Sequence, residues 1–108
     1  MPTHLGELEQ LVLLALLRLG DGAYGMTVRE ELVQVARRRP SYATIYSTLQ
    51  RLESKGLVKA RLGDPTPERG GRRKRLFTLT PAGSSVLRQS LAAVERMARG
   101  VAPILQDR

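Results

Sequence analysis

The segment from Leu5 to Leu19 constrains the fold most strongly, because the helix that it predicts is apolar on nearly every side. Apolar residues recur every third or fourth position, as a helix requires, at Leu5, Leu8, Leu11, Val12, Ala15, Leu16 and Leu19. Leu13, Leu14 and Leu17 lie off this stripe and are apolar as well. Such a helix needs burial on more than one side. In a chain of 108 residues, which fits one compact domain, the second side needs another segment or a second chain.

The rest of the sequence predicts two more helices, a β-hairpin and a closing helix. Residues 24–35 are amphipathic, and Ser41 can cap a third helix that buries Ile45, Leu49 and Leu52 and stops near residue 56. Residues 57–62 alternate apolar and basic side chains, as a half-exposed strand does, and residues 75–80 can return antiparallel to them. Thr80-Pro81 then opens a fourth helix. This order predicts a mainly α-helical fold with a small β-hairpin.

The closing helix carries an apolar heptad seam. Its members follow one another at alternating steps of four and three residues: Leu87, Leu91, Val94, Ala98, Val101 and Leu105. Gly100 and Pro103 are expected to interrupt the seam near its end. The seam can pack on the helices of a second chain or simply on its own domain.

The positive charge of the chain lies in one third of its length. The net charge is +8, but residues 37–75 contain twelve Lys and Arg against three acidic residues, whereas the remainder contains six basic and seven acidic residues. A basic block between nearly neutral segments indicates a polyanionic partner. A solvated, charged loop is the alternative interpretation.

The order of elements is that of a winged helix-turn-helix domain, in which the third helix enters the major groove and the tip of the hairpin reaches the neighbouring phosphates or the minor groove. With Ile45 taken as the buried direction, the third helix turns small polar side chains outward, and Gln50 can form two hydrogen bonds with adenine. The candidate DNA-binding residues are Ser41, Tyr42, Ala43, Thr44, Tyr46, Ser47, Gln50, Arg51, Arg69, Arg72, Arg73, Lys74 and Arg75. Tyr46 and Tyr24 could instead be packing residues, and Arg37, Arg38 and Arg39 could contact DNA or only favour a helix C-terminus.

Four stretches resemble PadR-type transcriptional regulators in order and spacing: "LGELEQLVLLALL", "YGMTVREEL", "SYATIYSTLQRLESKGLV" and "GGRRKRLFTLTPAG". The short chain is similar to the smaller subfamily, which implies a DNA-binding domain at 1–79 and a C-terminal dimerisation helix at 80–108. The resemblance also implies a homodimer in which this helix packs on the first helix of the partner. The expected interface residues are Leu8, Leu11, Val12, Leu87, Leu91, Val94 and Ala98. The chain has no Trp, so the aromatic-ligand site of some relatives is not expected.

We therefore expect a sequence-specific, homodimeric repressor that binds a palindromic duplex operator and is released by an unidentified ligand or signal. An RNA-binding or protein-binding winged helix is the alternative, since the fold serves those roles too. The sequence offers no nucleophile with a base in reach, no acid pair and no metal-ligand spacing, so neither an enzyme nor a cofactor or metal site is expected. It lacks cysteine and any apolar stretch of membrane-spanning length, which favours a cytoplasmic protein without a membrane partner.

Overall fold

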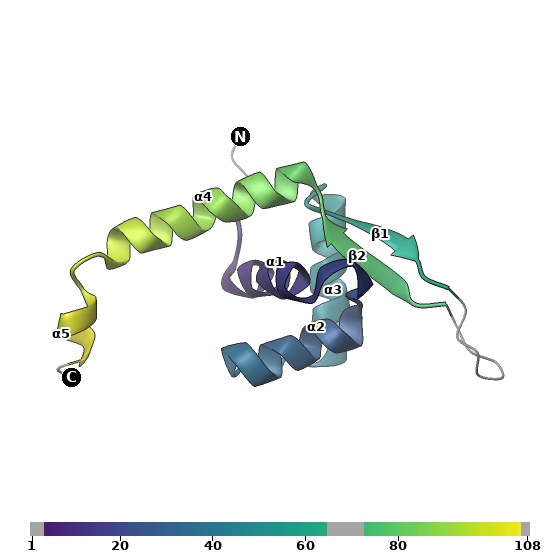
Figure 1. Ribbon diagram of the computed structural model, residues 1–108, viewed down its shortest axis with the longest axis horizontal. Coiled ribbons are helices and arrows are strands. Elements are labelled where there is room, and N and C mark those ends of the chain that lie inside the picture. Colours follow the sequence, from purple (N-terminus) through teal and green to yellow (C-terminus); the bar gives the residue numbers. More distant parts are fainter. Residues whose placement is uncertain (1–3, 65–72, 107–108) are drawn as a thin grey trace.

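The computed structural model describes residues 4–64 and 73–106, and these form a three-helix unit, a two-stranded hairpin and a long closing helix (Figure 1). The chain runs through α1 (Glu7–Leu19), a short 3₁₀ turn (Gly20–Gly22), α2 (Gly25–Glu31), α3 (Tyr42–Ser54), β1 (Val58–Leu62), β2 (Arg75–Leu79), α4 (Pro81–Ala98) and α5 (Ala102–Gln106). This is the winged helix-turn-helix order that the sequence predicts. Within the described ranges, none of the helices has the length and apolarity needed to cross a membrane.

The hydrophobic core lies where α1, α2 and α3 meet the base of the hairpin. The predicted inward residues of α3, Ile45, Leu49 and Leu52, are fully buried, which confirms the face assigned to them. Val12 of α1 and Leu87 of α4 belong to the same core, with 0% and 2% of their surface exposed. Their assignment to the dimer interface needs correction, because side chains buried within their own chain offer no surface to a partner.

α2 ends differently from the single helix that the sequence predicts to about Val35. Its α-helical part stops at Glu31, and the chain continues as a π-helical segment, η2 (Leu32–Ala36). Arg37 closes this segment in the left-handed conformation, with φ 59°, and the next amide, of Arg38, donates to the Leu32 carbonyl at 3.0 Å. The left-handed residue turns the chain into the loop that precedes α3.

The hairpin and α4 are joined to the core by close backbone contacts. β1 and β2 pair antiparallel, with Val58 opposite Leu79, as the sequence predicts. Thr80 caps α4 by accepting from the Gly83 amide at 3.0 Å, while its own amide donates to the Leu57 carbonyl at 3.0 Å. At Gly83 a Cβ would lie 2.0 Å from that carbonyl oxygen, so only glycine permits this approach.

α4 leaves the body of the protein after its first turns and makes the molecule elongated, with extents of 56 × 33 × 21 Å (Figure 1). At the middle of α4, Ser90 still contacts the body of the protein, where Gln10 of α1 donates to its hydroxyl. The helix ends at Ala98, and Gly100 follows with φ 76°, so the expected interruption of the heptad seam occurs there. Pro103 lies in the first turn of α5, where its missing amide hydrogen costs no helical bond, and it does not break the helix.

Candidate nucleic-acid interface

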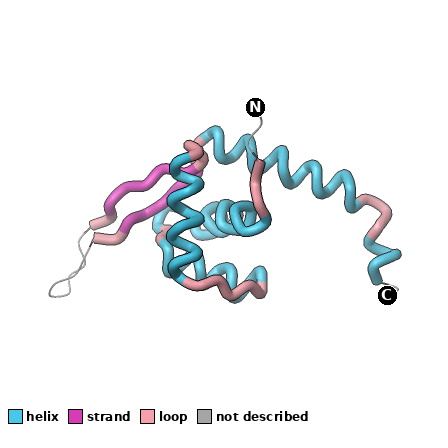
Figure 2. The backbone as a smooth tube through the Cα atoms, turned by 180° about the vertical axis from the view of Figure 1, so that it is seen from behind, coloured by secondary structure: helices cyan, strands magenta, loops and turns pink. Residues whose placement is uncertain are grey.

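The outward face of α3 carries the small and polar side chains that the sequence assigns to it. Figure 2 views the molecule from the side on which α3 is uncovered, with the hairpin projecting beside it. The exposed residues of this helix are Tyr42, Ala43, Thr44, Tyr46, Ser47, Gln50, Arg51 and Ser54. No carboxylate lies among them, so the face can approach a phosphate-lined groove without repulsion.

Local hydrogen bonds hold the start of α3. The hydroxyl of Ser41 accepts from the Thr44 amide at 3.1 Å, which confirms the predicted N-cap, and lies 2.9 Å from the Thr44 hydroxyl. The Ser47 hydroxyl donates to the Thr44 carbonyl at 3.1 Å. Gln50, by contrast, makes no side-chain hydrogen bond to any other residue in the described ranges, which leaves both its donor and its acceptor for an external partner.

The two tyrosines of α3 contact residues of α2. The Arg29 guanidinium lies 4.8 Å from the centre of the Tyr42 ring, and its Nε donates to the Pro40 carbonyl at 2.7 Å. Tyr46 is 50% exposed, and its ring end lies against Gly25, where a Cβ would approach to 2.6 Å. Tyr46 is therefore a surface residue supported by α2 and not a core aromatic. The support that Arg29 gives to α3 is not predicted, because no sequence pattern distinguishes it from a solvated arginine.

The β1–β2 hairpin forms the wing, and the basic residues at its base have partners within the chain. Arg73 donates through Nε to the Gly63 carbonyl at 2.7 Å, and Lys74 lies over the Tyr24 ring at 4.3 Å and donates to its hydroxyl at 3.2 Å. One nitrogen of Arg75 contacts both carboxylate oxygens of Glu53, at 2.8 and 2.9 Å.

These contacts leave Arg73 and Lys74 exposed but orient them, whereas Glu53 offsets part of the charge of Arg75. No sequence pattern indicates this pair, because Glu53 and Arg75 lie far apart along the chain. Arg69 and Arg72, which the sequence analysis also assigns to DNA binding, lie outside the described residues.

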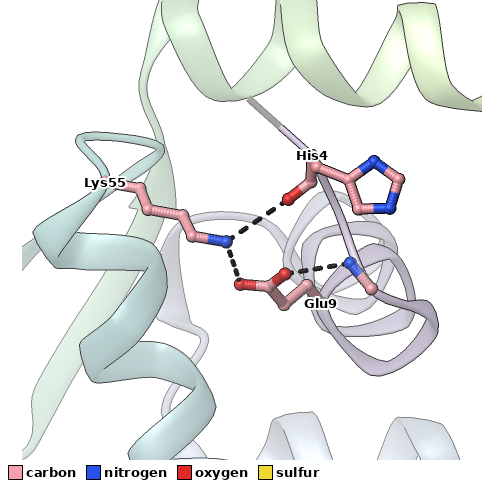
Figure 3. Close-up of polar contacts among 4 residues, drawn as sticks. His4, Glu9 and Lys55 are labelled. Carbon is pink, nitrogen blue, oxygen red and sulfur yellow. Dashed lines mark hydrogen bonds and ion pairs between the residues drawn. The ribbon is translucent and has the colours of Figure 1, made fainter. Parts of the chain in front are cut away.

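A partly buried ion pair joins the end of α3 to α1. Glu9 of α1 is only 5% exposed, and its carboxylate accepts from Lys55 Nζ at 2.7 Å and from the Gly6 amide at 2.9 Å (Figure 3). Burial alone raises the pKa of Glu9, but the hydrogen bonds from Lys55 and Gly6, with the charges of Lys55 and Arg51, outweigh it and hold the pKa below its ordinary value. The charged pair sets the position of the C-terminal end of the candidate recognition helix.

An apolar groove runs along the exposed side of α1. Part of it, about 280 Å³, lies between α1 and the end of α2, where Leu11, Leu14, Leu32 and Val35 line it. A second hollow of about 330 Å³ continues past Leu11 and is also lined by Leu8 and Pro40. The ion pairs Arg18–Glu31 and Arg38–Glu7 border these hollows. Over the described ranges, no three His, Asp or Glu side chains gather closely enough to hold a metal ion.

The comparisons with known proteins agree with this architecture. The model of the family described as transcriptional regulator PadR-like matches residues 13–89. A transcriptional regulator of Mycobacterium tuberculosis is 40% identical over 65 residues, which cover 58% of this chain and 55% of the relative. An uncharacterised 37.1 kDa protein of a Streptomyces fradiae transposon is 35% identical over 86 residues, covering 79% of this chain but 23% of the relative. The chain thus spans about half or less of the length of these two relatives.

Solved structures share the fold. A PadR family transcription regulator from Clostridium difficile superposes with a TM-score of 0.72 at 24% identity. The match covers 93% of this chain and 99% of the regulator. Bacillus subtilis PadR, solved in complex with operator DNA, gives a TM-score of 0.66 at 22% identity over 79% of this chain and 46% of that one. At these identities the likeness establishes the fold alone.

Proposed function

The chain belongs to the PadR-like family of transcriptional regulators, and from this premise we propose that it binds duplex DNA in a sequence-specific manner and represses transcription. The observation that carries the proposal is the outward face of α3, which is small, polar and free of carboxylates, beside a basic hairpin. The shared fold with an operator-bound PadR supports the same docking geometry.

In this arrangement α3 lies in the major groove. Ala43 and Ser47 let the helix approach the base edges closely, and Gln50 reads an adenine through its unpaired amide. Arg51 and the wing residues Arg73 and Lys74 contact phosphates, which position the helix but carry no sequence information. Arg75 contributes less, since Glu53 already holds its guanidinium.

The exposed half of α4 supports a homodimer. Val94 is 57% exposed and Met97 81%, although both are large apolar side chains. We propose that a second copy covers this surface, together with Leu91 and Ala98 of the same helix face, and that α4 of one chain lies along the α1 groove beside Leu8 and Leu11 of the other. A ligand or another signal that shifts this interface would change the spacing of the two α3 helices and release the operator.

Selection of randomised duplex DNA by the purified protein at near-physiological salt tests the proposal. We expect a palindrome whose half-sites lie about 10 base pairs, or about 34 Å, apart. Gln50→Ala should then relax the preference at one base pair and cost about 1–3 kcal/mol on the selected site. Binding without enrichment of any sequence would contradict the proposal and would favour the RNA-binding or protein-binding alternative.

The dimer is tested separately by Val94→Asp, which places a charge in the expected interface and leaves the core of the single chain intact. Sedimentation should give the mass of a monomer, while far-ultraviolet circular dichroism stays helical. Gln89→Asp adds the same charge to the opposite side of α4 and should leave the dimer unchanged. If Val94→Asp sediments as a dimer, the interface lies elsewhere.

A further inference from the structure

The three arginines that precede α3 are not equivalent in the structure. Arg38 turns towards α1, where its guanidinium contacts Glu7 Oε1 at 3.0 Å. Arg37 and Arg39 line a polar hollow of about 230 Å³ with Val33 and Gln34, at the end of the π-helical segment, and Arg39 also borders the hollow beside α1. Among the residues that the structure describes, neither of these two guanidinium groups forms an ion pair. The hollow thus brings together two guanidinium groups without an ion-pair partner in the described ranges and an amide donor, while Glu30 lines the adjoining hollow.

The backbone that presents this hollow is strained. Arg37 has φ 59°, and in the described ranges it alone, apart from glycines, has a positive φ. An L-residue in this conformation costs about 1–2 kcal/mol, a cost that glycine avoids. Backbone strain of this kind is concentrated at functional sites. A long basic side chain at a position that favours glycine therefore suggests that the charge itself has a use.

The hollow lies next to the start of the candidate recognition helix. Val33 and Gln34, which line it, also line a neighbouring hollow together with Tyr42, the first residue of α3. Arg29 fixes this junction through its contacts with Tyr42 and the Pro40 carbonyl. Figure 2 shows the loop before α3 on one side of that helix and the hairpin on the other.

We propose that Arg37, Arg39 and the Gln34 amide form a seat for a backbone phosphate of the bound nucleic acid, on the side of α3 opposite the wing. The wing and this seat then hold the two phosphate backbones that border one major groove. The inference rests on the proposed DNA-binding function and adds a contact outside α3 and the hairpin. Arg38 has no part in the seat, because Glu7 holds its charge against α1.

The test measures the dependence of affinity on salt concentration for Arg37→Gly and Arg39→Gln. The probes are a labelled duplex carrying the selected palindrome and a scrambled duplex of equal length. We expect each variant to bind both duplexes more weakly, and the slope of log K against log salt to fall by about 0.9 for each phosphate that the variant no longer neutralises. Base preference should stay as in the wild type, because a phosphate contact carries no sequence information.

A second readout separates this role from a structural one. Arg37→Gly removes the left-handed strain, so Tm should stay level or rise by a few degrees while DNA affinity falls. Arg39→Lys keeps the positive charge and should retain most of the wild-type slope of log K against log salt. Arg96→Gln removes one positive charge from the far half of α4 and serves as the charge-matched control, with an unchanged slope expected.

Three results would overturn the inference: wild-type slopes in both variants, an equal slope change in Arg96→Gln, or a fall in Tm that accounts for the weaker binding. A wild-type protein that selects no palindrome would instead contradict the proposed function. In that case the slopes on the scrambled duplex still report whether the seat binds phosphate.

Discussion

Replacing Gly83 with alanine tests how α4 is joined to the three-helix unit and its hairpin. The new Cβ would lie 2.0 Å from the Leu57 carbonyl oxygen and 2.9 Å from the carbonyl carbon, both of them backbone atoms that no side-chain rotation can move away. α4 must therefore shift, and the shift strains the bond from the Thr80 amide to Leu57 and the bond from the Thr80 hydroxyl to the Gly56 carbonyl at 2.6 Å.

Two effects of opposite sign decide the magnitude. Alanine is favoured over glycine within a helix by about 0.5–1 kcal/mol. Overpacking costs about 1–3 kcal/mol and sometimes more, and each weakened hydrogen bond adds about 0.5–1.5 kcal/mol. The clash outweighs the helix preference, so we expect a net loss of about 1–3 kcal/mol, and each kcal/mol lowers Tm by about 4–8 °C in a domain of this size.

Thermal unfolding followed by circular dichroism measures this loss, at equal protein concentrations because the proposed dimer would make Tm depend on concentration. Gly22→Ala is the matched control: Gly22 has nothing within 4 Å of the added Cβ, so its Tm should change little. A Tm for Gly83→Ala that equals or exceeds that of the wild type would refute the close approach of α4 to Leu57.

Three further changes probe the contacts around α3. Glu9→Gln should lower stability by about 1–2 kcal/mol at neutral pH, because the amide has a single acceptor oxygen, so either the Lys55 ammonium or the Gly6 amide loses its acceptor and the ammonium loses its counter-charge. The pKa of the Glu9 carboxyl is lowered in the folded protein, so its contribution to the free energy of unfolding is present above its ordinary pKa near 4.5 and is lost as pH falls through the folded value. Denaturant unfolding at several pH values should therefore show the stabilities of the variant and the wild type converging in acid. A stability difference that stays constant with pH would contradict this. Gly25→Ala should push the Tyr46 ring away from α2 and weaken DNA binding without unfolding the protein, as binding and circular dichroism measured together would show. Glu53→Gln should release Arg75 and steepen the salt dependence of DNA binding by about one unit of slope, and an unchanged slope would mean that Arg75 does not reach phosphate.

The local features of the fold follow from the sequence by itself. The period of apolar residues places Ile45, Leu49 and Leu52 on the buried face of α3. The hydroxyl residues Ser41 and Thr80, the latter followed by Pro81, mark where α3 and α4 begin. These features depend on neighbours within four residues, so the sequence pattern contains all the information required. The basic third of the chain likewise indicates a polyanionic partner through its charge alone.

The tertiary structure alone decided which charges and apolar groups remain available. Contacts across the fold pair Arg75 with Glu53 and Arg38 with Glu7. They also bury Val12 and Leu87 in a core that the apolar patterns of α1 and α4 could not distinguish from an interface. The π-helical end of α2 and the left-handed Arg37 also lie beyond a propensity argument, because packing overrides local preference there. Charge, periodicity and caps are properties of short segments, whereas the partner of a given side chain depends on residues brought together only by folding.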